Sequence, residues 1–254
     1  MLKAVLFDLD NTLILFDEKK FFQRYFPKIA QAFADIMPVD VFSKRIMSAT
    51  QLLLKNNGEM SNAEFFMKDF SAGYEAHLDE LWMRFMKFYE REYDQFQSLV
   101  SVPEGVREVF LKLLQKQMKL VIASNPMWPL NIQMKRLSWA GIGDLEFDLV
   151  THIENMSFCK PRIEYYQEIC HKINVKPEDC LMVGNDPVND MIVANIGMKT
   201  FLTVDSVEID DSSLALSREL LEEVPDDVPT PDFMGSLSDV PEVVDTLLLE
   251  ENTS

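Results

Sequence analysis

The stretch AVLFDLDNT, residues 4–12, joins a short apolar run to two carboxylates and a hydroxyl. Its first four residues predict a short buried β-strand, because they are all apolar and stop at a polar boundary. Alternate side chains of an extended chain share one face, so Asp8 and Asp10 should point into the same small space. Carboxylates that close repel each other, and a divalent cation can hold one ionised while the repulsion keeps the other protonated. The pair therefore indicates phosphoryl transfer through an aspartyl-phosphate.

The overall charge limits the partners of this 254-residue chain. Its formal net charge of −18 argues against general binding to nucleic acids or anionic membranes, because fields of Lys and Arg hold both. No apolar stretch is long enough to span a bilayer, and the first residues lack the basic-then-apolar order of a signal peptide. We therefore expect a cytoplasmic protein, as a monomer or a small homo-oligomer.

The cysteines predict reduced thiols. There are three, they form no Cys-x-x-Cys pair, and an odd number does not suit a disulfide framework. Cys159 stands beside Lys160, and we interpret it as a packing residue.

Residues 16–99 have a helical pattern throughout. The spacing of their apolar residues predicts four helices, at about 18–36, 40–55, 62–72 and 76–95. Asp17 suits the N-cap of the first helix, and Ser61 with Glu64 forms a capping box for the third. Twelve of the 18 Phe residues lie in this segment, which is enough apolar surface for a bundle core of its own. The alternative is that these rings line an apolar substrate pocket.

Beyond residue 100, apolar runs alternate with helical patterns. Strands are expected near 119–123, 147–151, 180–183 and 200–203, and helices near 103–116, 130–140, 161–173 and 188–196. This alternation predicts an α/β fold with a Rossmann-like parallel sheet and helices on both of its faces. The chain then consists of a core domain, residues 1–15 and 100–254, into which an all-helical domain, residues 16–99, is inserted.

The last part of the chain is acidic before it becomes regular again. We interpret residues 205–231 as a solvated surface with a short helical pattern at 214–223. Residues 232–249 then predict a final strand and helix.

Polar residues follow several predicted strands at the point where each strand ends. Asp8, Asp10 and Thr12 follow the first strand, and Ser124 and Asn125 follow the strand that ends at Ala123. The segment Gly184 to Asp190 follows a third strand, and Lys160 lies in the loop before a predicted helix. Ligands of open parallel sheets bind where the carboxyl ends of the strands meet, so this ordered set indicates one active site.

These motifs resemble those of the haloacid dehalogenase-like (HAD) hydrolase superfamily. The resemblance is carried by Asp8–Thr12, Val121–Asn125, Lys160–Pro161 and Val183–Asp190. It covers the α/β core, and the helical insert after the first motif resembles the cap domain that the family calls C1-type.

The resemblance implies a role for each motif. Asp8 would be the nucleophile that attacks phosphorus, and Asp10 the general acid and later the general base. The phosphoryl group would be bound by Thr12, Ser124, Asn125 and Lys160. Mg²⁺ would be held by Asp8, the Asp10 carbonyl and an acidic residue of the last motif. Dehalogenases of the superfamily lack the second Asp of the first motif, so Asp10 favours a phosphatase.

One departure from the family pattern leaves the metal ligand open. The superfamily often has Asp directly after the glycine of the last motif, whereas this chain has Asn185 there and an acid at Asp186. We assign the metal contact first to Asp186 and second to Asp190.

The leading hypothesis is thus a Mg²⁺-dependent phosphatase, a hydrolase for a small phosphorylated metabolite. A phosphomutase of the same superfamily keeps the same residues and is the nearest alternative. A non-catalytic module that binds phosphate or metal is a third reading. Specificity should come from the helical insert, with Phe16, Asp17, Lys20 and Arg24 as candidates that also suit plain helix surface.

Overall fold

The computed structural model describes residues 1–205 and 228–251. Within these residues one six-stranded sheet, parallel throughout, has the order β3-β2-β1-β4-β5-β6. Its strands are β1 (Ala4–Phe7), β2 (Lys119–Ile122), β3 (Leu149–Val150), β4 (Cys180–Gly184), β5 (Lys199–Thr203) and β6 (Phe233–Gly235). The predicted fold class is confirmed.

Strand β1 lies in the middle of the sheet, between β2 and β4. Its last residue, Phe7, is in register with Ile122 of β2 and Val183 of β4, so the three strands end side by side. The loops that follow them therefore start from one edge of the sheet. Since β2 and β4 lie on opposite sides of β1, this edge is also where the order of the strands reverses, the usual place for a ligand crevice.

Alternate residues of β1 pack into two separate apolar cores, one on each face of the sheet. Val5 and Phe7 pack into an apolar cluster with α5 (Val106–Gln115) and α10 (Val240–Glu251). Ala4 and Leu6 pack on the opposite face against α7 (Ile163–Ile173) and the segment after α8 (Pro187–Asp190). Both faces of β1 are fully buried, which explains why its sequence is a continuous apolar run rather than an alternating one.

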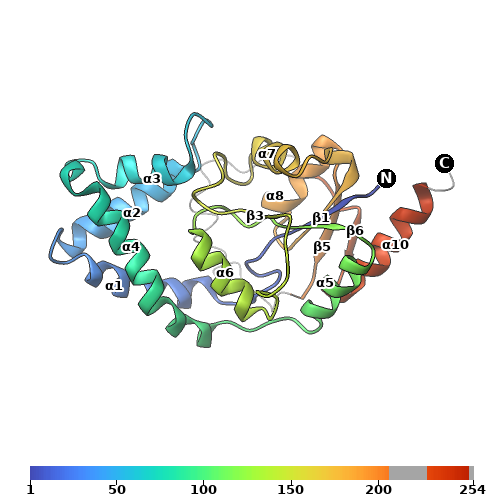
Figure 1. Ribbon diagram of the computed structural model, residues 1–254, viewed down its shortest axis with the longest axis horizontal. Helices are drawn as coiled ribbons and strands as arrows, with labels where there is room; N and C mark the ends of the chain where they lie inside the picture. The colour runs from blue at the N-terminus through green and yellow to red at the C-terminus, as the bar shows by residue number, and fades with distance from the viewer. Residues whose placement is uncertain (206–227, 252–254) are drawn as a thin grey trace.

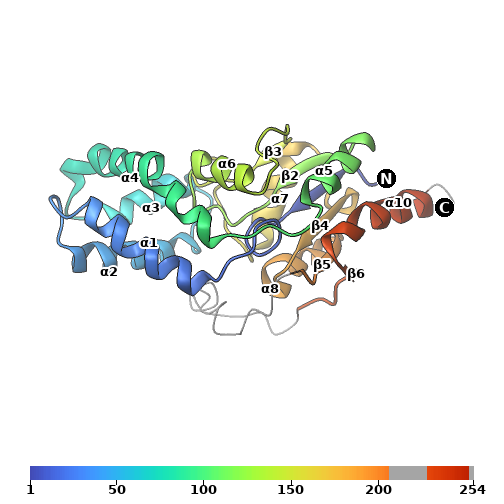
Figure 2. The same cartoon turned by 90° about the horizontal axis from the view of Figure 1, so that it is seen from below.

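The residues between β1 and α5 form helices α1 (Glu18–Ala32), α2 (Val39–Leu53), α3 (Asn62–Phe70) and α4 (Leu78–Glu92), with short 3₁₀ helices at Glu75–His77 and Tyr93–Leu99. Figures 1 and 2 show the four helices together at one end of an elongated molecule, with both chain termini at the other end. Asp17 caps α1 and Ser61 forms the predicted capping box with Glu64. We refer to residues 16–99 as the helical segment.

The aromatic side chains of the helical segment make its core. Phe33, Phe42, Phe70 and Phe85 are all buried, and their rings lie within 4.7 to 6.4 Å of one another. The same apolar cluster continues into the rest of the chain through residues such as Ile132 and Ile153. The division into domains at residues 16 and 99 stays a prediction, since the cluster crosses it.

The loop between α2 and α3 contacts the chain just before α7. Arg162 Nη1 donates to the Asn56 carbonyl at 2.6 Å, and Asn62 Nδ2 donates to the Phe158 carbonyl at 3.2 Å. Gly58, at a φ of +88°, lies against the Phe158 ring, and a Cβ atom there would overlap it. The helical segment is thereby fixed within two residues of Lys160.

Several helices differ from their predicted limits. Helix α1 ends at Ala32 rather than near residue 36, and α4 is Leu78–Glu92 rather than 76–95. Helix α5 begins at Val106 rather than near Pro103, because Gly105 takes a φ of +78° and serves as the N-cap. Helix α7 begins at Ile163, after an extended Arg162. The predicted helix at 188–196 is the short α8 followed by a 3₁₀ helix, Met191–Ile196.

The expected helix at 214–223 lies outside the described residues. Among the helices that the structure describes, none has the length and apolar character that crossing a membrane would require.

Candidate active site

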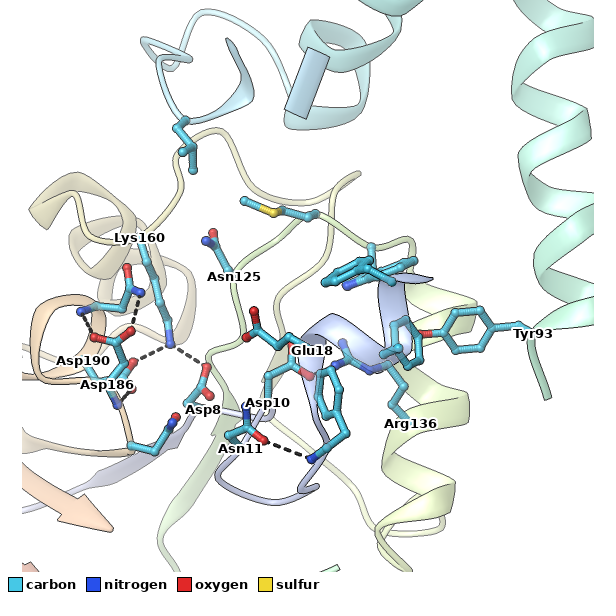
Figure 3. A pocket seen from close by; sticks show the side chains of 18 residues that line it. Asp8, Asp10, Asn11, Glu18, Tyr93, Asn125, Arg136, Lys160, Asp186 and Asp190 are labelled. Carbon is cyan, nitrogen blue, oxygen red and sulfur yellow. Dashed lines mark hydrogen bonds and ion pairs between the residues drawn. The ribbon is translucent and has the colours of Figure 1, made fainter. Parts of the chain in front are cut away.

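The loops after β1, β2 and β4 surround a cavity of about 140 Å³ (Figure 3). The backbone bonds that extend the sheet hold these loops together, from Asp8 N to the Val183 carbonyl at 2.9 Å and from Ala123 N to the Phe7 carbonyl at 2.7 Å. Six of the eight residues that the sequence placed in a site line the cavity: Asp8, Asp10, Asn125, Lys160, Asp186 and Asp190.

The turn after Asp8 brings both carboxylates of the first motif to the cavity. Asn11 adopts the left-handed conformation, with a φ of 57°, which Asn tolerates better than most residues. Its side-chain oxygen accepts a hydrogen bond from Phe16 N at 3.0 Å, which closes the turn. The side chains of Asp8 and Asp10 therefore face the same space, as their alternate positions predict (Figure 3).

Lys160 is a buried cation between two carboxylates. Its Nζ lies 2.7 Å from Asp8 Oδ1 and 2.6 Å from Asp190 Oδ1, and its side chain is 3% exposed. Burial by itself would lower the pKa of Lys160, but the nearby Asp190 and Asp8 carboxylates raise it well above its ordinary value. Lys160 is accordingly a fixed positive charge beside Asp8 and not a proton donor at neutral pH.

Asp190 is the more deeply buried of the two acids in the last motif. Its side chain is 1% exposed, and its second oxygen accepts a hydrogen bond from Asp186 N at 3.1 Å. Burial raises the pKa of Asp190, and the Lys160 ammonium opposes that rise. Both oxygens of this carboxyl group are thus already used within the protein.

Asp186 is half-buried and caps the short helix α8. Its Oδ1 accepts from Val188 N at 2.8 Å and from Asn189 N at 3.1 Å, and its Oδ2 accepts from Asn189 Nδ2 at 2.9 Å. Oδ1 thus uses both of its lone pairs, whereas Oδ2 keeps one, so these bonds orient Asp186 at the cavity wall and leave Oδ2 able to accept a further contact.

Thr12 and Ser124 are buried behind the cavity wall. The Thr12 hydroxyl lies 3.4 Å from Asp8 Oδ2 and 3.2 Å from Asn185 Oδ1, so it contacts the first carboxylate directly. The Ser124 carbonyl accepts hydrogen bonds from Thr151 Oγ1 at 2.6 Å and from the Tyr165 hydroxyl at 2.8 Å, which fixes the loop after β2. A phosphate contact by either hydroxyl stays a prediction.

The sequence of this chain matches the model of a known protein family. The model for haloacid dehalogenase-like hydrolases matches residues 2–195, which is most of the chain. The chain belongs to the haloacid dehalogenase-like hydrolases. The resemblance drawn from the four motifs is thereby confirmed, and this HAD-like protein is a hydrolase enzyme.

Solved structures share the fold of this HAD-like hydrolase. A HAD phosphatase from Thermococcus onnurineus matches with a TM-score of 0.56 and 18% identity, over 96% of this chain and 98% of the other. L-2-haloacid dehalogenase from Xanthobacter autotrophicus matches with a TM-score of 0.55 and 17% identity, over 96% and 99%. A protein assigned as a β-phosphoglucomutase from Thermotoga maritima has a TM-score of 0.53 and 19% identity, over the same shares. Identities this low show the fold alone, and no match was found among curated protein sequences.

Arg136 is a site residue of this HAD-like hydrolase that the sequence reading missed. It comes from α6 (Leu130–Trp139), is buried, lines the cavity, and forms an ion pair with Asp10 (Figure 3). Burial lowers the pKa of Arg136 to about 9, although the Asp8 charge opposes this, so the guanidinium remains cationic at neutral pH. A signal was present in the sequence, because Gln133 and Arg136 lie on the same predicted helix face as Ile132 and Leu137. Polar residues within an apolar face have a buried partner.

Part of the cavity wall is aromatic. It includes Phe16, which was a specificity candidate, and also Phe21, Phe22, Tyr93 and Trp128. The rings of the helical segment thus serve both as core and as cavity wall. Asp17 instead caps α1 and pairs with Lys20, while Arg24 is exposed on the surface of that helix.

The cavity of the HAD-like hydrolase has an excess of negative charge. Its lining holds five carboxylates but only two basic groups, Lys160 and Arg136, and both are already paired with carboxylates. A phosphate dianion would be repelled there unless a further cation were bound. In the part of the chain that the structure describes, no three His, Cys, Asp or Glu side chains form a metal cage. Mg²⁺ commonly takes only one or two carboxylates and completes its shell with substrate phosphate and water, so Asp8 and Asp186 suit it.

Proposed function

We propose that this HAD-like hydrolase is a Mg²⁺-dependent phosphatase for small phosphomonoesters that works through an aspartyl-phosphate on Asp8. The observation that supports the proposal is the position of Asp8, which shares a cavity with a second carboxylate, Asp10, while a buried ammonium holds one of its oxygens at 2.7 Å. A carboxylate nucleophile needs an ionised oxygen directed at phosphorus, and an acid close by to protonate the leaving group.

In the first step Asp8 attacks phosphorus and the bond from phosphorus to the ester oxygen breaks. The electron pair of that bond goes to the leaving oxygen, which takes the proton of Asp10. Lys160 pairs with Asp8 and would stabilise the negative charge on the phosphoryl oxygens. Asn125 lines the cavity, and we assign its side-chain amide a hydrogen bond to one of these oxygens.

In the second step Asp10 takes a proton from water while the water oxygen attacks the phosphorus of the aspartyl-phosphate. The bond to Asp8 breaks, inorganic phosphate leaves, and Asp10 is protonated again for the next cycle. Thr12 contacts Asp8 throughout and restrains the returning carboxylate.

Mg²⁺ held by Asp8, the backbone carbonyl of Asp10 and Asp186 would neutralise charge on the phosphoryl oxygens. We prefer Asp186 to Asp190 for this role, because Asp190 is almost fully buried and forms an ion pair with Lys160, whereas Asp186 is half-buried at the cavity wall.

The substrate class follows from the walls of the cavity. A cavity of about 140 Å³ supports a small phosphorylated metabolite as the substrate. The helical segment closes one side of the cavity with aromatic rings, and we propose that residues 16–99 act as a cap that keeps bulk water from the reaction.

The test is phosphate release from a panel of phosphomonoesters, measured with Mg²⁺ and after treatment with EDTA. We expect turnover that EDTA abolishes and Mg²⁺ restores, and no turnover by Asp8→Asn. Formation of an isomeric phosphate ester without release of phosphate would identify a phosphomutase instead. Full activity of Asp8→Asn would remove Asp8 as the nucleophile.

A further inference from the structure

Arg136 contacts Asp10 from the side of the cavity away from Lys160. Its Nη2 pairs with Asp10 Oδ1, while Lys160 contacts Asp8 and Asp190 (Figure 3). The two carboxylates of the first motif therefore have separate basic partners, which come from different segments of the chain.

The contact involves one oxygen of the Asp10 carboxyl group, which has this ion pair but no hydrogen-bond partner among the described residues. Its Oδ1 is fully buried, yet 30% of the Asp10 side chain is exposed. The exposed part is therefore the rest of the side chain, with Oδ2 as its polar atom. With Oδ1 held by Arg136, Oδ2 is the oxygen that faces the cavity.

Arg136 is itself held in place by buried neighbours. Its Nη1 donates to Gln133 Oε1 at 3.1 Å, and Gln133 Nε2 donates to the Thr151 carbonyl at 3.0 Å. The guanidinium carbon also lies 5.8 Å from the centre of the Trp128 ring, within the range of a cation–π contact. Thr151 in turn bonds the Ser124 carbonyl, so the chain of contacts from Asp10 ends at the loop after β2.

A purely structural role does not account for this pair. Buried ion pairs can usually be replaced by apolar residues of similar size at little cost in stability, because of the penalty for desolvating the charges. Arg136 lies at the cavity wall, and its partner is the carboxyl group that must move two protons in each catalytic cycle.

We propose that Arg136 is a positioning residue that holds Asp10 with Oδ2 directed at the ester oxygen and, later, at the attacking water. This inference rests on the proposed phosphatase function. In the first step Oδ2 delivers its proton to the leaving oxygen as the bond to phosphorus breaks, and in the second step it takes a proton from water. Loss of Arg136 should impair both transfers but not the attack by Asp8.

Substrates with different leaving groups separate these steps. p-Nitrophenolate leaves without much help from an acid, whereas an alkoxide needs protonation. For Arg136→Met we therefore expect a normal first burst of p-nitrophenol from p-nitrophenyl phosphate in rapid-mixing experiments, followed by slower turnover. Turnover of an alkyl phosphate should fall by about 10²-fold, the usual size of a proton-transfer contribution, with little change in KM.

Three further variants complete the test. Arg136→Lys keeps the charge and should recover part of the alkyl phosphate activity. Gln133→Leu removes the support of the guanidinium and should show the same pattern in a milder form. Arg107→Gln, which breaks an exposed pair with Asp144, is the matched control and should behave as wild type.

The outcomes are distinct. If Arg136→Met slows the burst from the aryl ester as much as it slows alkyl turnover, the residue is structural and the proposal is wrong. Unchanged turnover of both esters would also overturn it. Wild-type protein that releases phosphate from no ester overturns the phosphatase function, and the role of Arg136 with it.

Discussion

The backbone of Gly184 lies directly against the side chain of Asp190. A Cβ atom at residue 184 would overlap the Asp190 carboxyl group and lie 2.7 Å from its Cβ, closer than real Cβ contacts come. Glycine at the end of β4 is therefore what lets Asp190 reach Lys160. We expect Gly184→Ala to displace Asp190, to destabilise the fold by about 1–3 kcal/mol through overpacking, and to reduce kcat by about 10²-fold through the loss of an ordered charge next to Asp8.

Gly235→Ala provides a matched control for that variant. The added Cβ would again meet a carboxylate, lying 2.6 Å from Asp239 Oδ2, but away from the cavity. Because the Asp239 carboxylate can turn aside, urea denaturation should show a smaller loss of stability for Gly235→Ala than for Gly184→Ala. Phosphatase assays should show a loss of kcat for Gly184→Ala alone. Equal kcat values for the two would mean that Asp190 has no part in catalysis.

The sequence predicted the parts of this molecule that local patterns determine. The alternation of Asp8 and Asp10, the Ser61 capping box and the ends of β1, β2 and β4 all follow from spacing within a few residues. The ion pair of Arg136 with Asp10 joins residues 126 positions apart, and no local pattern specifies such a partner. For the same reason the sequence did not show that Thr12 contacts Asn185, which is 173 positions away.

The predicted limits of a helix were wrong where a single residue determined where the helix begins. Gly105 takes a positive φ and delays α5, although Pro103 suits the first turn of a helix. The choice between Asp186 and Asp190 as metal ligand was open for a similar reason, because it depends on which acid Lys160 occupies.

Phe22 should contribute to substrate binding without contributing to the chemistry. It lies on the cavity wall and comes from α1. We expect Phe22→Ala to raise KM about tenfold, equivalent to roughly 1.4 kcal/mol, with kcat little changed. The control is Phe26→Ala, one turn further along α1, which removes a ring stacked on Phe22 but outside the cavity. Steady-state kinetics on the best ester of the panel measures the difference, and equal KM values for the two variants would contradict a binding role.

Cys159 should be chemically inert although it precedes Lys160. The thiol is buried, accepts a weak hydrogen bond from Asn62, and has its pKa raised by burial to about 12 from the ordinary value of 9. Because only the thiolate reacts, iodoacetamide should leave Cys159 unmodified in the folded protein at neutral and mildly alkaline pH, and modify it in urea. Peptide mass spectrometry reads this out directly, and labelling at equal rates in both states would contradict the burial.

The raised pKa of Cys159 also affects how the stability of the protein depends on pH. Above the ordinary pKa, the unfolded thiol loses its proton while the folded thiol keeps it, so the unfolded state binds fewer protons. Stability must then fall as the pH rises from about 9 towards 12. Cys159→Ala should reduce the slope of the free energy of unfolding against pH in that range, as measured by urea denaturation.

Asn62 should matter for both stability and turnover, because it connects the helical segment to the loop that carries Lys160. Its side chain accepts from Asn56 Nδ2 at 2.8 Å and donates to the Phe158 carbonyl at 3.2 Å, two residues before Lys160. Asn62→Ala leaves both groups without this partner in a buried position, which should cost about 1–3 kcal/mol in urea denaturation. Because the Lys160 loop loses a restraint, kcat should fall as well. Asn57→Ala, at an exposed neighbour, should change stability by less than about 0.5 kcal/mol and leave kcat unchanged. An Asn62→Ala protein with lower stability but wild-type kcat would show that the helical segment does not help to position Lys160.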